Sequence, residues 1–118
     1  MLNVKDALNK IEADSVGALG VALVDYESGM CLGTKGTGID LEIAAAGNME
    51  VVKAKMKVMN DLGIDGGIED ILITLGGQYH IIHPVGSSMF LYLAIDRKQG
   101  NLAMARRKLG SVAEELNV

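Results

Sequence analysis

The sequence predicts a small α+β domain in which one antiparallel sheet carries helices on both faces. Three observations predict it: helix-spaced and strand-like segments follow one another along the chain, one strand is apolar on both faces, and 49% of only 118 residues are hydrophobic. A chain of this length holds one core, so residues 1–118 are expected to form a single domain.

The first predicted element is a helix over Asn3–Ala13, because its apolar residues recur at helical spacing and Asn3 can cap it. The segment Val16–Tyr26 is apolar at both odd and even positions, which is typical of a strand covered on both faces. A turn containing glycine, Glu27–Gly29, follows, and Met30–Thr34 returns as the second strand of a hairpin.

A long helix is predicted over Asp40–Leu62, with Asp40 as its cap and Gly63 marking its end. Short turns then separate three strands, which form an antiparallel meander: Ile68–Leu75, Gln78–Val85 and Ser88–Asp96. A last helix covers Asn101–Leu116. The predicted order is therefore helix, hairpin, long helix, three-strand meander and helix.

The long helix has more apolar surface than one sheet can cover. Its polar residues gather in an arc of roughly 80° on a helical wheel, and this polar arc consists of Glu42, Glu50, Lys53, Lys57 and Asn60. Asn48 and Lys55 divide the rest of the circumference into two apolar stripes. The first stripe contains Ile43, Ala44, Gly47, Val51, Ala54, Val58 and Leu62, and the second contains Leu41, Ala45, Met49, Val52, Met56 and Met59.

Two apolar stripes require two covering surfaces. One is the chain's own sheet, and the other is expected to be the same helix of a second copy, because two-fold dimers are the commonest oligomers. Coverage by loops or by the other helices is the alternative. The wheel does not decide which stripe faces the sheet. We assign the second stripe and the dividing residues to the dimer interface: Leu41, Ala45, Asn48, Met49, Val52, Lys55, Met56 and Met59.

The strand Ile68–Leu75 predicts a second dimer contact, because it begins the meander and is the natural edge of the sheet. A long apolar edge left bare invites aggregation, and pairing with its own copy removes that hazard. The expected contacts are Ile68, Asp70, Leu72 and Thr74, with Glu69 and Asp70 limiting the length of the pairing.

Several segments together resemble the roadblock / dynein light-chain family, over essentially the whole chain and in the manner of its stand-alone prokaryotic members. They are Gly17–Asp25, Glu69–Leu75 with Gln78–His80, Leu91–Leu93 with Asp96–Arg97, and Asn101–Arg106. The resemblance implies a profilin-like fold with sheet order 2-1-5-4-3, the long helix on one face and the terminal helices on the other. It also implies a homodimer formed through the long helix and the third strand.

The resemblance further implies a function. Members of this family regulate or anchor small Ras-like GTPases, or act as scaffolds, and carry no catalytic residues. We therefore expect a non-enzymatic homodimer, without cofactor or metal, that regulates or docks a small Ras-like GTPase through the polar arc; the sequence does not separate an activator from an exchange factor or an anchor. The alternatives are a nucleotide-independent scaffold subunit of a signalling or motor complex, and a small-ligand sensor.

Charge and composition oppose several other functions. The net charge of −4 disfavours binding to nucleic acid or to an acidic membrane. No apolar run is long enough to cross a bilayer, and Met1–Asp6 lacks the features of a signal peptide, so a cytoplasmic location is expected. Cys31 is the only cysteine, which excludes an internal disulfide, and it is expected to be inert.

Chemical motifs are also absent or incomplete. The segment Gly33–Gly38 lacks the residue order of a phosphate-binding loop. His80 and His83 point to opposite faces of a strand, so no shared metal site is expected. Ser87, Ser88, Asp70 and the histidines form no hydrolase motif. Four basic residues form a patch around the last helix and are expected to be a solvated face, with a partner contact as the alternative: Arg97, Arg106, Arg107 and Lys108.

Overall fold

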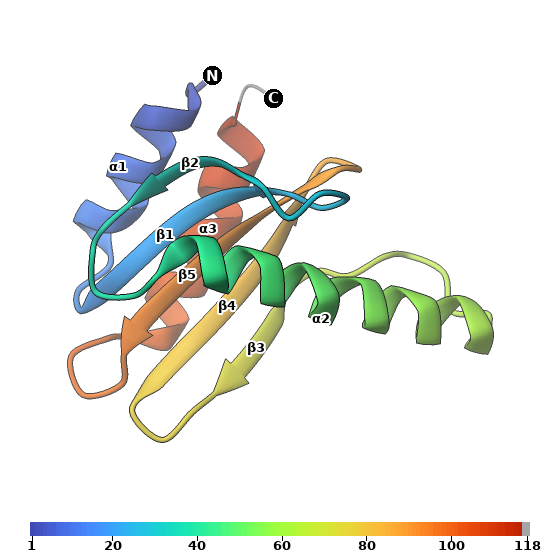
Figure 1. The fold of residues 1–118 in the computed structure, drawn as a ribbon. Helices are drawn as coiled ribbons and strands as arrows, with labels where there is room; N and C mark the ends of the chain where they lie inside the picture. The colour runs from blue at the N-terminus through green and yellow to red at the C-terminus, as the bar shows by residue number, and fades with distance from the viewer. Residues whose placement is uncertain (117–118) are drawn as a thin grey trace.

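The computed structural model describes residues 1–116 and has the predicted order of elements (Figure 1). The helices are α1 (Val4–Asp14), α2 (Leu41–Leu62) and α3 (Leu102–Glu115). The strands are β1 (Ala18–Asp25), β2 (Cys31–Lys35), β3 (Ile71–Thr74), β4 (Gln78–Val85) and β5 (Met89–Asp96). They form one antiparallel sheet in the order β2-β1-β5-β4-β3. The predicted fold class, element order and sheet order are confirmed.

Side-chain caps fix the start of each helix. The side chains of Asn3, Asp40 and Asn101 accept hydrogen bonds from backbone N–H groups three residues later, at 2.8, 3.1 and 3.0 Å. Such caps satisfy donors that have no partner inside the helix. At its far end α2 stops at Gly63, whose φ of 70° lies in the left-handed region that glycine adopts without strain.

Two strands, β1 and β3, are shorter than predicted by more than one residue. β1 begins at Ala18 rather than at Val16, because Gly17 turns the chain with a φ of 81° and Val16 is exposed. β3 covers only Ile71–Thr74, paired with Tyr79–Ile82 of β4. The predicted strand residues Ile68–Asp70 lie outside that pairing.

The helices divide between the two faces of the sheet, as predicted. α1 and α3 lie on one face and α2 crosses the other, with its C-terminal part extending past the β3 edge (Figure 1). The core therefore has two layers. Leu93 of β5 packs beneath α1 and α3, whereas the preceding residue, Tyr92, packs beneath α2. Val21–Val24 of β1 are fully buried, which confirms a central strand covered on both faces.

No helix within residues 1–116 has both the length and the apolar character needed to cross a membrane.

Candidate functional site

The stripe of α2 that faces the sheet is the second stripe, which we assigned to a dimer partner. Leu41, Ala45, Val52 and Met59 are at most 9% exposed, and the first three pack in the core layer beneath α2. The assignment of Leu41, Ala45 and Val52 to a dimer interface is therefore wrong, because their own chain already covers them. The assignment of Met59, which lines a groove on the surface, stays a prediction.

Of the other four residues assigned to the helix interface, two make contacts within their own chain and two are exposed to solvent. Asn48 is half-buried and its Nδ2 donates a hydrogen bond to the Ala44 carbonyl oxygen at 2.7 Å, within the same helix. Met49 packs against the turn between β1 and β2, where its Sδ lies 3.1 Å from the position that a Cβ on Gly29 would occupy. Lys55 and Met56 are exposed and remain available to a partner.

The first apolar stripe of α2 is the exposed one. Ile43, Val51, Val58 and Leu62 are 72%, 37%, 46% and 65% exposed. Gly47 lies between them, and no atom comes within 4 Å of the position of a Cβ there. Within residues 1–116, neither the loops nor the other helices cover these side chains. The alternative, in which the same chain covers both apolar stripes of the helix, is therefore wrong for these residues. An exposed apolar patch of this kind is typical of a protein-interaction site.

The exposed stripe was visible in the sequence but was assigned to the wrong surface. Gly47 was the available signal, because a glycine inside a helix costs about 1 kcal/mol relative to alanine and is often kept for close packing. In the structure a Cβ at Gly47 would point into open space, with no side chain or neighbouring element within 4 Å. Its position is therefore suited to close approach by a second helix.

The predicted polar arc borders the exposed stripe on one side. Lys53 is half-buried, and its Nζ donates to the Glu27 carbonyl oxygen at 3.1 Å. Lys57 pairs with Asp61 at 3.0 Å, although such an exposed pair stabilises little. The other three arc residues make no side-chain hydrogen bond within residues 1–116: Glu42, Glu50 and Asn60. The arc thus presents unengaged polar groups.

On its other side the exposed stripe meets a groove of about 470 Å³ between α2 and the segment preceding β3. Val51, Lys55 and Met59 line it from the helix, and Gly67–Ile71 line it from the segment. β3 is the last strand of the sheet on this side. The stripe, the groove and the open edge of β3 therefore form one continuous surface.

The predicted contacts at β3 are only partly available. Thr74 is exposed and Ile68 is half-buried in the wall of the groove. Leu72 packs against the core layer beneath α1 and α3, and Asp70 is held by Arg106. Leu72 and Asp70 make contacts within their own chain but are only partly buried, so their assignment to the dimer contact stays a prediction.

The groups considered for catalysis or metal binding lie apart. The Tyr92 hydroxyl is 3.1 Å from His80 Nδ1 on the α2 face, whereas His83 lies beside Gly110 of α3 on the opposite face. This confirms that the two histidines point to opposite faces. Burial and the nearby Glu42 carboxylate raise the pKa of the Cys31 thiol, which makes it a poor nucleophile. No cluster of metal-binding side chains occurs among the described residues.

The basic residues expected to form a solvated face are mostly engaged within the chain. Arg97 donates to the Leu75 carbonyl oxygen at 2.9 Å and lies over the Tyr79 ring. Lys108 pairs with Asp14 at 2.8 Å, and the Lys108 ammonium lowers the pKa of that carboxyl. Arg106 binds Asp70. Lys108 thus links α3 to α1, and Arg106 links α3 to the segment before β3. Arg97, Arg106 and Arg107 are nevertheless exposed, as expected of a solvated face.

Comparisons with known proteins give a consistent result for the fold. No family model and no curated protein matches the sequence. Among solved structures, a Roadblock/LC7 domain from Streptomyces avermitilis aligns with a TM-score of 0.84 at 12% identity, over 97% of this chain and 94% of that one.

Two further structures align over most of both chains. MglB from Myxococcus xanthus has a TM-score of 0.76 at 19% identity, covering 93% of this chain and 85% of that chain. The gliding protein MglB from Thermus thermophilus has a TM-score of 0.74 at 19% identity, covering 94% and 88%. The chain therefore has the Roadblock/LC7 fold, which the sequence resemblance implied.

Proposed function

We propose that the chain is a non-catalytic homodimer, joined through α2 and the β3 edge, that docks a small Ras-like GTPase. The observation that carries the proposal is the exposed apolar stripe of α2, continuous with an open sheet edge. A second copy related by a two-fold axis covers such a surface with its own equivalent. One solved MglB structure similar to this chain has a tetrameric arrangement, which is a precedent for self-assembly on this fold.

The proposed dimer interface replaces the stripe first assigned to it. It comprises the exposed apolar residues, Lys55, which is the available residue of the earlier assignment that adjoins them on α2, and the strand segment: Ile43, Gly47, Val51, Ala54, Val58, Leu62, Lys55, Ile68 and Thr74. Gly47 and Ala54 permit close approach of the two helices. A helix of 22 residues is about 33 Å long, so the seam spans most of the molecule.

The polar arc would then remain open beside the seam. Glu42, Glu50 and Asn60 have no side-chain partners within residues 1–116, and a two-fold axis places a second arc next to the first. A GTPase is suited to such a surface, because contact with its switch loops can change their order without any catalytic group from the partner.

Recovery of purified Ras-like GTPases on the immobilised protein tests the proposal. The GDP-bound form and the form loaded with a non-hydrolysable GTP analogue are compared. We expect one form to be recovered preferentially, and recovery to fall several-fold for the double variant Glu42→Lys, Glu50→Lys. The matched control is Glu114→Lys, an exposed acidic residue of α3 on the other face of the sheet.

The possible outcomes separate the candidate functions. Equal recovery of both nucleotide forms would favour a scaffold that ignores nucleotide, and no recovery would overturn GTPase docking. Loss of recovery in the arc variant alone would assign the contact to the polar arc. Loss in the control variant as well would point to a nonspecific charge effect.

A further inference from the structure

A second open edge lies on the opposite side of the sheet from β3. β2 is the terminal strand there and pairs only with β1. Within residues 1–116, no backbone hydrogen bond outside that pairing involves Leu32–Lys35. An edge strand leaves the N–H and C=O groups of alternate residues pointing outward. β2 therefore offers unpaired backbone groups to an added strand.

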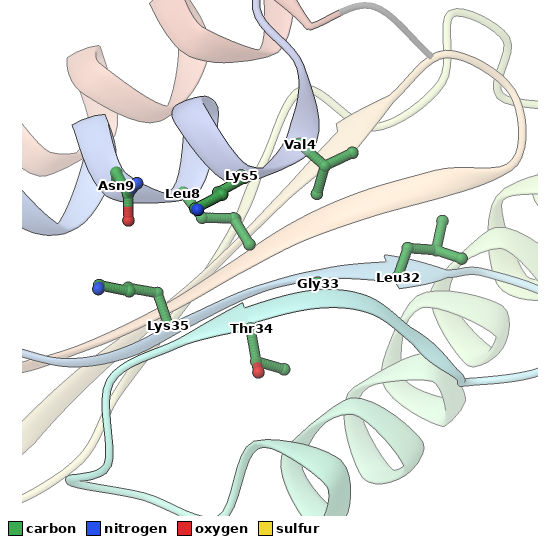
Figure 2. A pocket seen from close by; sticks show the side chains of 8 residues that line it. All are labelled: Val4, Lys5, Leu8, Asn9, Leu32, Gly33, Thr34 and Lys35. Atoms are coloured by element: carbon green, nitrogen blue, oxygen red, sulfur yellow. The ribbon is translucent and has the colours of Figure 1, made fainter.

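The helix α1 lies above this edge and encloses a pocket of about 450 Å³ with it (Figure 2). Figure 2 shows Val4 and Leu8 pointing from α1 toward β2, and Leu32 on the same side of the strand. Leu32 is 52% exposed, although it is a large apolar residue. We call this pocket, with the β2 edge that it borders, the α1–β2 groove. Its floor is apolar.

Gly33 brings the helix close to the strand. A Cβ at this position would lie 2.7 Å from Val4 Cγ1 and 3.0 Å from Leu8 Cδ1, so a side chain there would force α1 away from β2. The close contact places the apolar side chains of α1 directly beside the open backbone of β2.

The groove is positively charged, although the chain as a whole is acidic. Lys5 of α1 and Lys35 of β2 border it from opposite sides, and both are exposed (Figure 2). Among residues 1–116, no carboxylate forms an ion pair with either lysine. The net charge of the chain is −4, so two unpaired lysines across one groove oppose the overall charge. The carboxylate of Glu12 lies beyond the end of the groove, near Gly36. The positive charge of the groove is therefore confined to the part beside β2.

We propose that the α1–β2 groove binds an extended acidic segment of another protein, which adds a strand to the β2 edge. Backbone groups of the segment would pair with β2, and its side chains would alternate between the two faces. Gly33 and Lys35 lie two positions apart in the regular part of β2, after a register shift at Leu32, so an apolar side chain beside Gly33 and Val4 and an acidic one near Lys35 should also lie two positions apart. A second copy of this chain is a poor occupant, because it would bring its own two lysines against Lys5 and Lys35.

This inference does not rest on the proposed GTPase docking, since α1 and α2 cover opposite faces of the sheet. The probe is a capped peptide of about seven residues, a typical strand length. Threonine occupies alternate positions, and the other face carries one valine followed by two glutamates. The same peptide in reverse order tests the opposite strand direction, and a version with glutamine for glutamate tests the charge.

Titration into isotope-labelled protein, followed by amide NMR, tests the proposal. We expect saturable shifts at Leu32–Lys35 and in the first turns of α1 for one of the two acidic peptides. The double variant Lys5→Gln, Lys35→Gln should weaken this binding about tenfold, since each exposed ion pair contributes modestly. Lys98→Gln with Arg107→Gln removes two charges elsewhere on the exposed surface and should have no effect.

Several results would overturn the proposal. They are the absence of saturable shifts at millimolar peptide, shifts confined to the β3 edge, and binding that is unchanged by removal of the two groove lysines. Equal binding of the glutamine peptide would also contradict it. Shifts at Leu32–Lys35 that depend on protein concentration without peptide would assign the edge to a second copy instead.

Discussion

Arg106 of α3 holds Asp70 through two hydrogen bonds, from Nε to Oδ2 at 2.7 Å and from Nη2 to Oδ1 at 2.8 Å. The paired geometry matches the flat guanidinium to the carboxylate and fixes direction as well as distance. Asp70 immediately precedes β3, and the chain before it contains Gly66 and Gly67, both at positive φ. The pair therefore anchors the start of the edge strand to the terminal helix.

Loss of this pair should loosen β3 without unfolding the chain. We expect Arg106→Ala to increase amide hydrogen exchange several-fold at Ile71–Thr74 and to leave β1 and β5 unchanged, because only the edge strand depends on the anchor. The control is Arg107→Ala, since Arg107 is adjacent, exposed and forms no ion pair within residues 1–116. Equal exchange in both variants would show that the pair does not hold the strand.

The sequence predicted the fold more accurately than the ends of its strands. The short turns on either side of β4 identified it with its observed bounds, and the apolar residues on both faces of β1 placed that strand inside the sheet rather than at an edge. β3 was predicted from Ile68, because the apolar pattern continues through that segment. The apolar pattern carries no information about the ion pair between Asp70 and Arg106, which lies 36 positions further along the chain. That contact helps to keep residues 68–70 outside the sheet.

Val51 and Val52 provide a matched test of which side of α2 faces the sheet. Val52 is 3% exposed and packs in the core, so Val52→Ala should lower the free energy of unfolding by roughly 1–3 kcal/mol at any protein concentration. Val51 lies in the exposed stripe, and Val51→Ala should mainly alter the concentration dependence of unfolding. Urea denaturation at two protein concentrations measures both effects. Equal and concentration-independent losses would contradict the assignment of the stripes.

The orientation of α2 could not be predicted from its composition. Both stripes are apolar and of similar width, so hydrophobicity alone gave no preference between Val52 and Val58. The difference arises from the position of the helix on the sheet, where Ala45 is fully buried in one cluster with residues of β1 and β5. That fit depends on contacts between distant parts of the chain. The presence of two stripes was predictable from sequence, but their assignment was not.

A charge in the exposed stripe should break the proposed dimer. We expect Val58→Glu to weaken self-association by about a hundredfold, because the seam would have to bury an unpaired carboxylate. Sedimentation at micromolar concentration measures it, with the unchanged chain expected at twice its 12.5 kDa mass. Met104→Glu is the control, since Met104 is also an exposed apolar residue, at 62%, but lies on α3. If the wild-type protein sediments as a monomer, or if both variants weaken self-association equally, the proposed interface is wrong.

The contact between His80 and Tyr92 makes stability depend on pH. The Tyr92 hydroxyl lies 3.1 Å from His80 Nδ1, and His80 Nε2 lies 2.7 Å from Gln78 Oε1. A neutral imidazole fits both contacts, with Nδ1 accepting and Nε2 donating. Burial raises the pKa of Tyr92 to about 12, so the hydroxyl stays protonated throughout the neutral range. Burial also lowers the pKa of His80 from its usual value of 6.5.

Because the folded pKa of His80 lies below the unfolded value, the unfolded chain binds more protons as pH falls below about 6.5. The free energy of unfolding should therefore be constant above that pH with respect to this group, and fall between about pH 6.5 and the lower folded pKa. Burial lowers the pKa of His83 too, but nearby acidic groups, Asp70 first among them, oppose the shift. We expect His80→Gln to flatten the pH dependence more than His83→Gln. Urea denaturation between about pH 7.5 and pH 5.5 tests this, and an unchanged slope in His80→Gln would show that another group causes the loss.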